Sequence, residues 1–424
     1  MNFIKTSFLS GSSTAISLLA RLISTKIVAV YLGTNGMFLM GQLKDFLRLG
    51  NTIGSFGIEN GIVKYASEYE NNERKLSDII GTSFKINFVS ALIFSGIILI
   101  FKNQIADFLQ INFSVNFYFL ILILSIISAS IHTCFLAIYN GLNKIKLYVL
   151  VNIFSNILSA IILVLLVLKM EIIGAFYALA INQIISLFIN IIFFTIYKPF
   201  NIKWIFRKYL YDNLKKLSSF SIMAVVGPTC LIISTFIVRD YIFEEFGADY
   251  AGSWEAMWRI SAIYLLFLIT TFKFYLIPTF SKLNESDLKK EVFKIWRVVI
   301  PIIIIITAGV YLTKDIIINV LLSKEFVLIN SIILFHLIGD IIKINCWVLG
   351  NIMISKADTK SFVFFQIEWS TIFVILSYIF IQKYGFVGVS ISYFITYIIH
   401  FSLLNIYFRK LLWINLNLKI RLHF

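Results

Sequence analysis

Charged residues are scarce in this chain of 424 residues, and proline and cysteine are scarcer still. Only 14% of the residues are charged, whereas 59% are hydrophobic, and the mean hydropathy is +0.89. This composition excludes an ordinary soluble domain. Four prolines are too few to interrupt many helices, and the 42 phenylalanines fit long apolar segments. We therefore expect an all-α membrane protein.

Motifs for enzymatic chemistry are also lacking. The three cysteines lie in apolar segments, without the spacing of metal ligands or of a disulfide framework. There is no Walker loop and no nucleophile motif, so neither an enzyme nor a bound cofactor is expected. The net charge of +15 is spread over short segments between apolar runs, which argues against a nucleic-acid partner.

Apolar runs long enough to cross a bilayer recur along the whole chain. A transmembrane helix needs about 20 such residues. Between these runs lie only short connectors. The twelve expected spans are residues 8–32, 37–63, 79–101, 115–139, 148–168, 172–196, 217–238, 251–278, 292–313, 328–353, 361–382 and 386–408.

Lysine and arginine are distributed unevenly between the two sides of the membrane. With the N-terminus inside, the cytoplasmic segments hold 23 of the 37, the outside loops hold six, and eight lie within spans. The positive-inside rule then predicts that both termini are cytoplasmic. The most basic segment, residues 201–216, is expected to be an amphipathic connector on the anionic inner leaflet of the membrane.

The chain also repeats itself. Residues 23–31 match residues 233–241 at six of nine positions, and an offset of 214 then pairs Gly33 with Gly247, residues 146–153 with 360–367, and Gly174 with Gly388. This predicts two pseudo-symmetric six-helix lobes, 1–200 and 217–424, joined by the connector. Transporters built from such repeats bind substrate between the halves and alternate access by rocking.

A polar stripe runs along the second expected span. It is formed by Gly41, Lys44, Arg48, Asn51, Ser55 and Glu59, next to a glycine stripe of Gly50, Gly54, Gly57 and Gly61 that permits close helix contact. An ionisable side chain near the bilayer centre costs about 2.5–3.5 kcal/mol. We therefore expect the polar stripe to face a water-filled cavity.

Basic residues outnumber acidic ones within the spans, eight against five, which favours an anionic ligand. Arginine matches a diphosphate geometrically. The expected substrate contacts are Arg21, Lys44, Arg48, Arg259 and Lys273. The alternative is internal ion pairing, of Asp45 with Arg48 and of Glu255 with Arg259.

Five titratable side chains are candidates for coupling transport to H⁺ or Na⁺. They are Asp45, Glu59, Glu255, Asp340 and His132. Two of them have an alternative interpretation: Glu59 as part of a cavity rim, and His132 as a hydrogen-bonded structural residue.

Four segments resemble the Wzx-type O-antigen flippases, polysaccharide transporters of the MATE-like MOP exporter superfamily. The segments are GIENGIVKYASEY (57–69), NGLNKIKLYVLVN (140–152), GSWEAMWRIS (252–261) and YGFVGVSISYF (384–394). The resemblance implies a V-shaped cavity between two lobes, lined by Arg21, Arg48 and Arg259. It implies flipping of an undecaprenyl-pyrophosphate-linked oligosaccharide, with a polymerase and a chain-length regulator as partners in the same pathway.

Two other functions remain open at this stage. A multidrug or organic-ion antiporter of the same fold is expected to have an acidic or aromatic cavity. An O-antigen polymerase or other membrane glycosyltransferase is expected to have a sizeable external loop with catalytic residues. The longest expected outside loop, about residues 239–250, is short, and Arg239 is its only basic residue.

Overall fold

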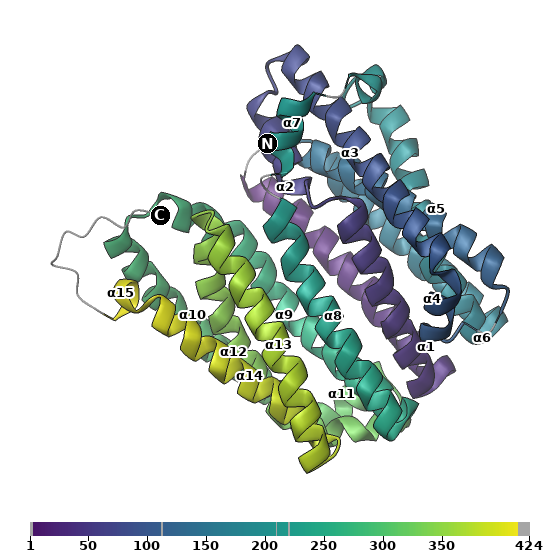
Figure 1. Cartoon of the computed structure of the whole chain (residues 1–424), viewed down its shortest axis with the longest axis vertical. Helices are drawn as coiled ribbons and strands as arrows, with labels where there is room; N and C mark the ends of the chain where they lie inside the picture. The colour runs from purple at the N-terminus through teal and green to yellow at the C-terminus, as the bar shows by residue number, and fades with distance from the viewer. Residues whose placement is uncertain (1–2, 112, 209, 219–220, 414–424) are drawn as a thin grey trace. The chain divides into compact units, whose positions relative to one another are not determined.

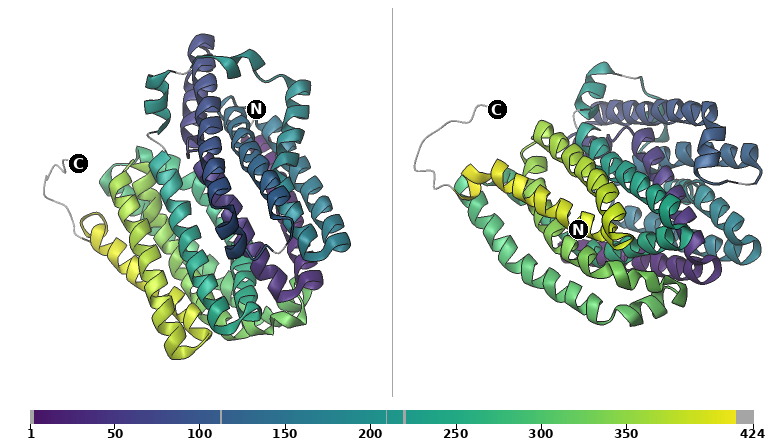
Figure 2. Two further views of the ribbon diagram at one scale, coloured as in Figure 1. Left: turned by 45° about the vertical axis from the view of Figure 1, so that its right-hand side comes forward. Right: turned by 60° about the horizontal axis from the view of Figure 1, so that its bottom comes forward.

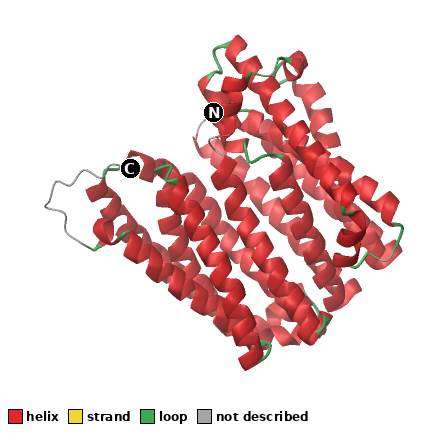
Figure 3. Ribbon diagram, in the orientation of Figure 1, coloured by secondary structure: helices red, strands yellow, loops and turns green. Residues whose placement is uncertain are grey.

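The computed structural model describes residues 3–111, 113–208, 210–218 and 221–413, and helix is the regular structure throughout these ranges (Figure 3). The helices of the first part of the chain are α1 (Phe3–Gly54), α2 (Glu59–Glu68), α3 (Glu73–Ile100), α4 (Lys102–Phe108), α5 (Val115–Gly141), α6 (Ile145–Tyr197), η1 (Ile202–Phe206) and α7 (Tyr211–Ser218). They are followed by α8 (Ser221–Phe246), α9 (Ala248–Lys282), α10 (Glu285–Leu312), α11 (Lys314–Leu321), η2 (Lys324–Leu328), α12 (Ile329–Ser355), α13 (Thr359–Tyr384), α14 (Val387–Tyr407) and α15 (Arg409–Leu412) (Figure 1).

The expected spans correspond to these helices. Within the described residues, nine helices are long and apolar enough to cross a membrane. Two of them, α1 and α6, each consist of two helical segments that meet at a residue with non-helical backbone angles, Gly33 and Glu171. Helix α6 therefore contains two expected spans, and α1 contains the first expected span and most of the second. The expected span 251–278 falls within α9, which has 35 residues. The prediction of an all-α protein with many membrane spans is confirmed.

The second expected span differs from the prediction, because it is not one helix. Helix α1 ends at Gly54, and α2 begins at Glu59. Between them Phe56 and Gly57 both have positive φ, 52° and 61°, which an α-helix does not allow. Glu59 therefore lies on a different helix from Lys44 and Arg48, and the polar stripe is interrupted before it reaches Glu59.

The chain forms two compact units, and the boundary between them lies within α8. The first unit contains Met1–Ile232 and Val320–Ser323, and the second contains Ile233–Asn319 and Lys324–Phe424. In the first unit α6 packs along α1 and α5, and α5 also packs against α3 and α2 (Figure 2). In the second unit α12 packs against α14, α9 and α10, and α14 also packs against α13. Lobe boundaries at 200 and 217 stay a prediction.

The internal repeat extends to the backbone geometry of each unit. Gly33 has φ 61° and ψ −158°, and Gly247, 214 positions later, has φ 89° and ψ −178°. Glu171 has φ 49° and ψ −127°, and Gly385, again 214 positions later, has φ 63° and ψ −149°. Since these conformations are rare for L-residues, their recurrence at one offset supports two copies of one helical unit.

The basic connector docks on the first unit. Lys85 of α3 donates a hydrogen bond of 2.7 Å from Nζ to the carbonyl oxygen of Arg207. On α7, Lys216 donates to the hydroxyl of Tyr69 at 3.2 Å, and this hydrogen bond raises the pKa of the Lys216 ammonium group. Hence the described part of this segment forms two short helices, η1 and α7, held against α2 and α3.

The expected outside loop at 239–250 is wrong. Helix α8 continues to Phe246 and α9 begins at Ala248, so Gly247 alone joins them. Arg239 lies inside α8 and is 2% exposed. The positive φ of Gly247 allows this tight connection, and no room remains there for the catalytic loop that a polymerase would need.

Candidate functional site

Two arginines of α1 come together although they are 27 positions apart in sequence. The kink at Gly33 lets α1 fold back, and Arg21 and Arg48 lie close enough for their positive charges to repel each other. Both side chains are exposed, and within the described residues no carboxylate forms a salt bridge with either. The alternative of internal ion pairing therefore receives no support, within these residues, for Asp45 with Arg48. Lys44 and Asp45, on the same part of α1, are half-buried.

Neutral hydrogen-bonding groups lie on α1 and its neighbouring helices. The amide Nδ2 of Asn156 on α6 donates to Oγ of Ser17 at 2.9 Å, and Oγ of Ser159 donates to Oδ1 of Asn182 at 2.6 Å. Asn51 on α1 is half-buried and accepts from Thr133 of α5 at 3.5 Å. Hydroxyl and amide groups of this kind suit a sugar, which presents both donors and acceptors.

In the second unit, Arg259 is held by a carboxylate. Nε of Arg259 lies 2.9 Å from Oε1 of Glu255, and Nη2 of Arg239 lies 2.8 Å from Oε2 of the same residue. The alternative of internal ion pairing is thus confirmed for Glu255 and Arg259. The Nη1 and Nη2 atoms of Arg259 are buried and have no hydrogen-bond partner among the described residues, so they can still bind an anion.

Asp340 on α12 is fully buried and accepts hydrogen bonds from several elements. Tyr393 of α14 donates to Oδ1 at 2.7 Å, and Ser261 and Tyr264 of α9 donate to Oδ2. Nζ of Lys343, one turn along α12, lies 3.6 Å from Oδ1. Both carboxylate oxygens are therefore satisfied, and a permanent cation balances the charge.

Lys343 itself is enclosed by aromatic rings. Its Nζ donates to the Tyr393 hydroxyl at 2.9 Å and lies 4.8 Å from the ring centroid of Trp258 and 5.3 Å from that of Trp347. The imidazole of His336 stacks on the Tyr393 ring at 4.4 Å between centroids. Cation–π contacts stabilise a buried ammonium group that water does not reach.

The remaining expected site residues are dispersed. His132 on α5 is buried, with Nδ1 3.2 Å from Nδ2 of Asn190, whose Oδ1 accepts from Tyr139 at 2.7 Å, which favours the structural interpretation. Glu59 is half-buried at the start of α2 and interacts electrostatically with Cys134 of α5. The side chain of Lys273 lies outside the described part of the chain.

Three features escaped the sequence-based prediction. Arg239 was assigned to a loop. It directly follows an apolar run that is expected to be helical, and this continuity could have placed it inside the helix that is α8. Asn156 and Asn182 were not considered, because single amides in an apolar run carry no distinct pattern. The third feature is a contact of 2.6 Å between His400 and Glu368, which are 32 positions apart. No sequence signal pairs them.

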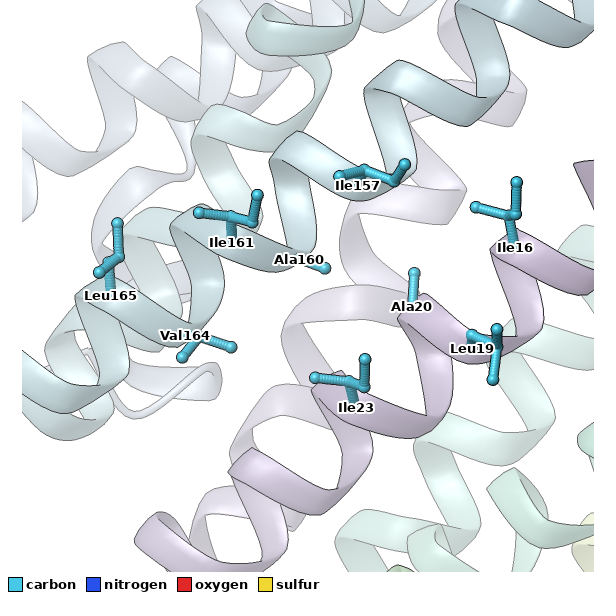
Figure 4. A pocket seen from close by; sticks show the side chains of 9 residues that line it. All are labelled: Ile16, Leu19, Ala20, Ile23, Ile157, Ala160, Ile161, Val164 and Leu165. Carbon is cyan, nitrogen blue, oxygen red and sulfur yellow. The ribbon is translucent and has the colours of Figure 1, made fainter.

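An apolar crevice of about 410 Å³ lies between α1 and α6 (Figure 4). Its lining consists of Ile16, Leu19, Ala20, Ile23, Ile157, Ala160, Ile161, Val164 and Leu165. Since successive helical residues differ by about 100° in direction, Arg21 points away from these residues. The crevice suits hydrocarbon, and it is separate from the polar face that carries the arginines.

Metal binding receives no support from the side chains. Across the part of the chain that the structure describes, no group of three or more histidine, cysteine, aspartate or glutamate side chains has a geometry that could hold a metal ion. The site is therefore defined by basic, amide, hydroxyl and aromatic groups.

Comparison with known proteins gives consistent matches. Residues 18–330 match the profile of a family described as polysaccharide biosynthesis protein. The lipid III flippase of Escherichia coli (strain K12) is 27% identical over 410 residues, which cover 95% of this chain and 97% of that protein. The lipid III flippase of Shigella flexneri matches with the same identity and coverage.

Solved structures match over almost the full length. An inward-facing multidrug resistance MATE transporter of the MOP superfamily has a TM-score of 0.78 at 11% identity, covering 93% of this chain and 95% of that one. The lipid II flippase MurJ in an inward closed conformation has a TM-score of 0.68 at 18% identity, covering 96% and 87%. At these identities the likeness establishes the fold, which is MATE-like.

The sequence relatives are named as flippases and not as enzymes, in agreement with the expected class. The resemblance to Wzx-type flippases is likewise confirmed by the family match and the relatives. The chain therefore belongs to the polysaccharide biosynthesis protein family and is a polytopic membrane protein with the fold of the MOP transporter superfamily.

Proposed function

We propose that this protein flips a lipid-linked oligosaccharide, an undecaprenyl-pyrophosphate-linked O-antigen or related unit, across the bacterial inner membrane. Both termini are cytoplasmic in this proposal, and the substrate moves from the cytoplasmic to the periplasmic leaflet by alternating access. The relatedness to the lipid III flippases supports the substrate class. A polymerase and a chain-length regulator of the same pathway would receive the product.

The observation that carries the proposal is that the positive charges of Arg21 and Arg48 act on each other while, among the described residues, neither arginine forms a salt bridge with a carboxylate. The two guanidinium groups repel each other, and each is attracted to a diphosphate that lies between them. At an effective dielectric of about 20, a unit negative charge ~4 Å from a guanidinium group attracts it by about 4 kcal/mol. Arginine can bind phosphate oxygens through two parallel N–H bonds, so this part of α1 is suited to the diphosphate.

Other groups take the remaining parts of the substrate. Lys44 lies about one turn before Arg48 and adds positive charge, and the free Nη atoms of Arg259 give the second unit its own anion-binding group. The amides of Asn156 and Asn51, with the hydroxyls of Ser17 and Thr133 that they contact, serve the sugars. The polyprenyl tail stays in the bilayer. Apolar surfaces such as the crevice between α1 and α6 do not oppose the movement of this tail.

Coupling to an H⁺ or Na⁺ gradient is part of the proposal. Of the expected coupling residues, Glu255 and Asp340 are each held by a basic side chain, and His132 lies in a hydrogen-bonded network. Asp45 and Glu59 are half-buried carboxylates of the first unit. A fixed counter-charge stabilises the deprotonated carboxylate, which disfavours proton binding by Glu255 and Asp340.

Complementation tests the proposed substrate site. In a flippase-null strain with its cognate oligosaccharide pathway, we expect Arg21→Ala and Arg48→Ala to abolish surface polysaccharide at normal protein levels. Arg48→Lys should restore only part of it, because lysine offers one ammonium in place of a fork of donors. Lys290→Ala is the control, since its side chain is 79% exposed in a surface ion pair. Normal display from both alanine variants would refute the arginine site.

A further inference from the structure

A carboxylate and an imidazole meet inside the second unit, where α13 and α14 pack together (Figure 1). Oε2 of Glu368 lies 2.6 Å from Nδ1 of His400, and each side chain is only 9% exposed. The other carboxylate oxygen, Oε1 of Glu368, is buried and has no hydrogen-bond partner among the described residues. Intramembrane ionisable groups are costly and rare, so this pair requires an explanation.

The pair differs from the other buried carboxylates of this unit, Glu255 and Asp340, in what balances the negative charge. Glu255 faces two arginines, and Asp340 faces the ammonium group of Lys343 in addition to His336, whose Nε2 lies 3.9 Å from Oδ2. Glu368 faces an imidazole, which is positive only while it holds a proton. With one proton the Glu368–His400 pair has no net charge, and without it the pair carries −1 in a buried place.

We infer that Glu368 and His400 together form a proton-binding site, which serves as the coupling site of the transport proposed above. The bound proton lies between Nδ1 of His400 and Oε2 of Glu368. Burial favours the neutral, protonated pair because an unbalanced buried charge is costly. When a conformational change admits water to the pair, the cost of the negative state falls and the proton leaves to that water.

The surroundings of the pair contain few groups that could take over this role. From α12, the thiol of Cys346 interacts electrostatically with Glu368, and its Sγ contacts the Tyr397 carbonyl at 4.0 Å. On α14 the ring centroid of Tyr397 lies 6.4 Å from that of His400 and 5.9 Å from the ammonium group of Lys343. Lys343 forms its ion pair with Asp340, so its positive charge is already balanced there and does not replace the proton of His400.

The nearest other carboxylate along the same two helices is Asp358, the N-cap of α13. Its carboxylate accepts from the backbone N–H of Ser361 at 3.2 Å and from the Tyr407 hydroxyl at 2.7 Å. Burial alone would raise the pKa of Asp358, but these hydrogen bonds outweigh it and hold the pKa below its ordinary value. Asp358 therefore remains ionised at neutral pH, and it provides a matched control on the same helices.

The first experiment measures the proton directly and does not require a substrate. Infrared difference spectra of the purified protein in lipid nanodiscs are recorded between about pH 5 and about pH 8, the range in which histidine titrates. We expect carboxyl and imidazole signals that disappear together in Glu368→Gln and in His400→Gln and persist in Asp358→Asn. A spectrum of the unmutated protein identical to that of both pair variants would overturn the inference, even if the protein flips lipid.

The second experiment joins the site to transport. In proteoliposomes with a lipid-linked oligosaccharide, a proton gradient should accelerate flipping by the unmutated chain. Glu368→Gln, which keeps the size of the side chain, should lose the acceleration, whereas Asp358→Asn should keep it. Acceleration equal to that of the unmutated protein would refute the coupling role. If the unmutated chain flips nothing but the infrared signals appear, the proposed substrate fails and the proton site stands.

Discussion

Replacement of Glu255 by glutamine gives the sharpest test of the electrostatics inside the second unit. Glu255→Gln keeps the shape of the side chain and removes the negative charge between Arg239 and Arg259, whose nitrogens lie 2.8 and 2.9 Å from its oxygens. The side chains of Arg239, Glu255 and Arg259 are exposed by only 3, 10 and 11%. Solvent therefore screens these charges weakly.

The size of the effect follows from Coulomb's law. With charge centres about 4 Å apart and an effective dielectric of about 20, each arginine gains about 4 kcal/mol from the carboxylate, and two arginines roughly 8 Å apart repel each other by about 2 kcal/mol. The substitution turns a net attraction into a repulsion, while the smaller desolvation cost of the amide offsets part of the loss. Removing one partner of a buried ion pair costs about 3–5 kcal/mol, and we expect a destabilisation in this range.

Arg239→Gln provides the internal comparison. It removes one positive charge and leaves the pair of Glu255 with Arg259, so we expect less than half of the destabilisation that Glu255→Gln causes. The measurement is the thermal unfolding midpoint of each purified variant in the same detergent, with Lys290→Ala as the surface control, which should change stability by at most about 1 kcal/mol. The reasoning fails if Glu255→Gln matches the surface control, or if Arg239→Gln is the more destabilising of the two.

Three further predictions use the same measurement. Tyr393→Phe removes a hydroxyl that joins an ammonium group to a carboxylate, and we expect it to lower stability by about 1.5–3 kcal/mol, whereas Tyr384→Phe, at an exposed ring, should be neutral. The pKa of the Asp358 carboxyl is lower in the folded protein than in the unfolded chain. The stability that its ionised form adds is therefore complete above the ordinary pKa of about 4 and declines as the pH falls below that value. We expect the difference in melting temperature between the unmutated protein and Asp358→Asn to shrink only in that acid range. Glu171→Gly should relieve about 1–3 kcal/mol of backbone strain, and Gly385→Ala, at the equivalent place of the second copy, should introduce it; a loss of stability in Glu171→Gly would contradict this.

Composition and periodicity predicted the helices well, because apolar length alone determines which segments cross a bilayer. The offset of 214 also predicted where the second copy repeats the backbone turn of Gly33, at Gly247. The break before Glu59 could not be foreseen. The helical periodicity of the sequence continues through residues 55–58. Phe56 has a positive φ, which is rare for phenylalanine and which its residue type does not predict.

The candidate site was predictable where a pattern lies on one helix. The pairing of Glu255 with Arg259 follows from a spacing of four residues, and it was among the stated alternatives. The contact of His400 with Glu368 depends on how α13 and α14 pack, and that information is distributed over many apolar contacts. Side-chain pairs between two different helices are therefore the part of the site that a single sequence does not predict.

The aromatic enclosure of Lys343 has a practical consequence for watching this protein at work. Its ammonium group lies 4.8 and 5.3 Å from the indole rings of Trp258 and Trp347. Indole emission shifts in wavelength and intensity when a nearby charge moves, so these two fluorophores report displacement of that ammonium group within its cage. With the other five of the seven tryptophans replaced by phenylalanine, stopped-flow fluorescence could time rearrangements inside this unit without an attached dye.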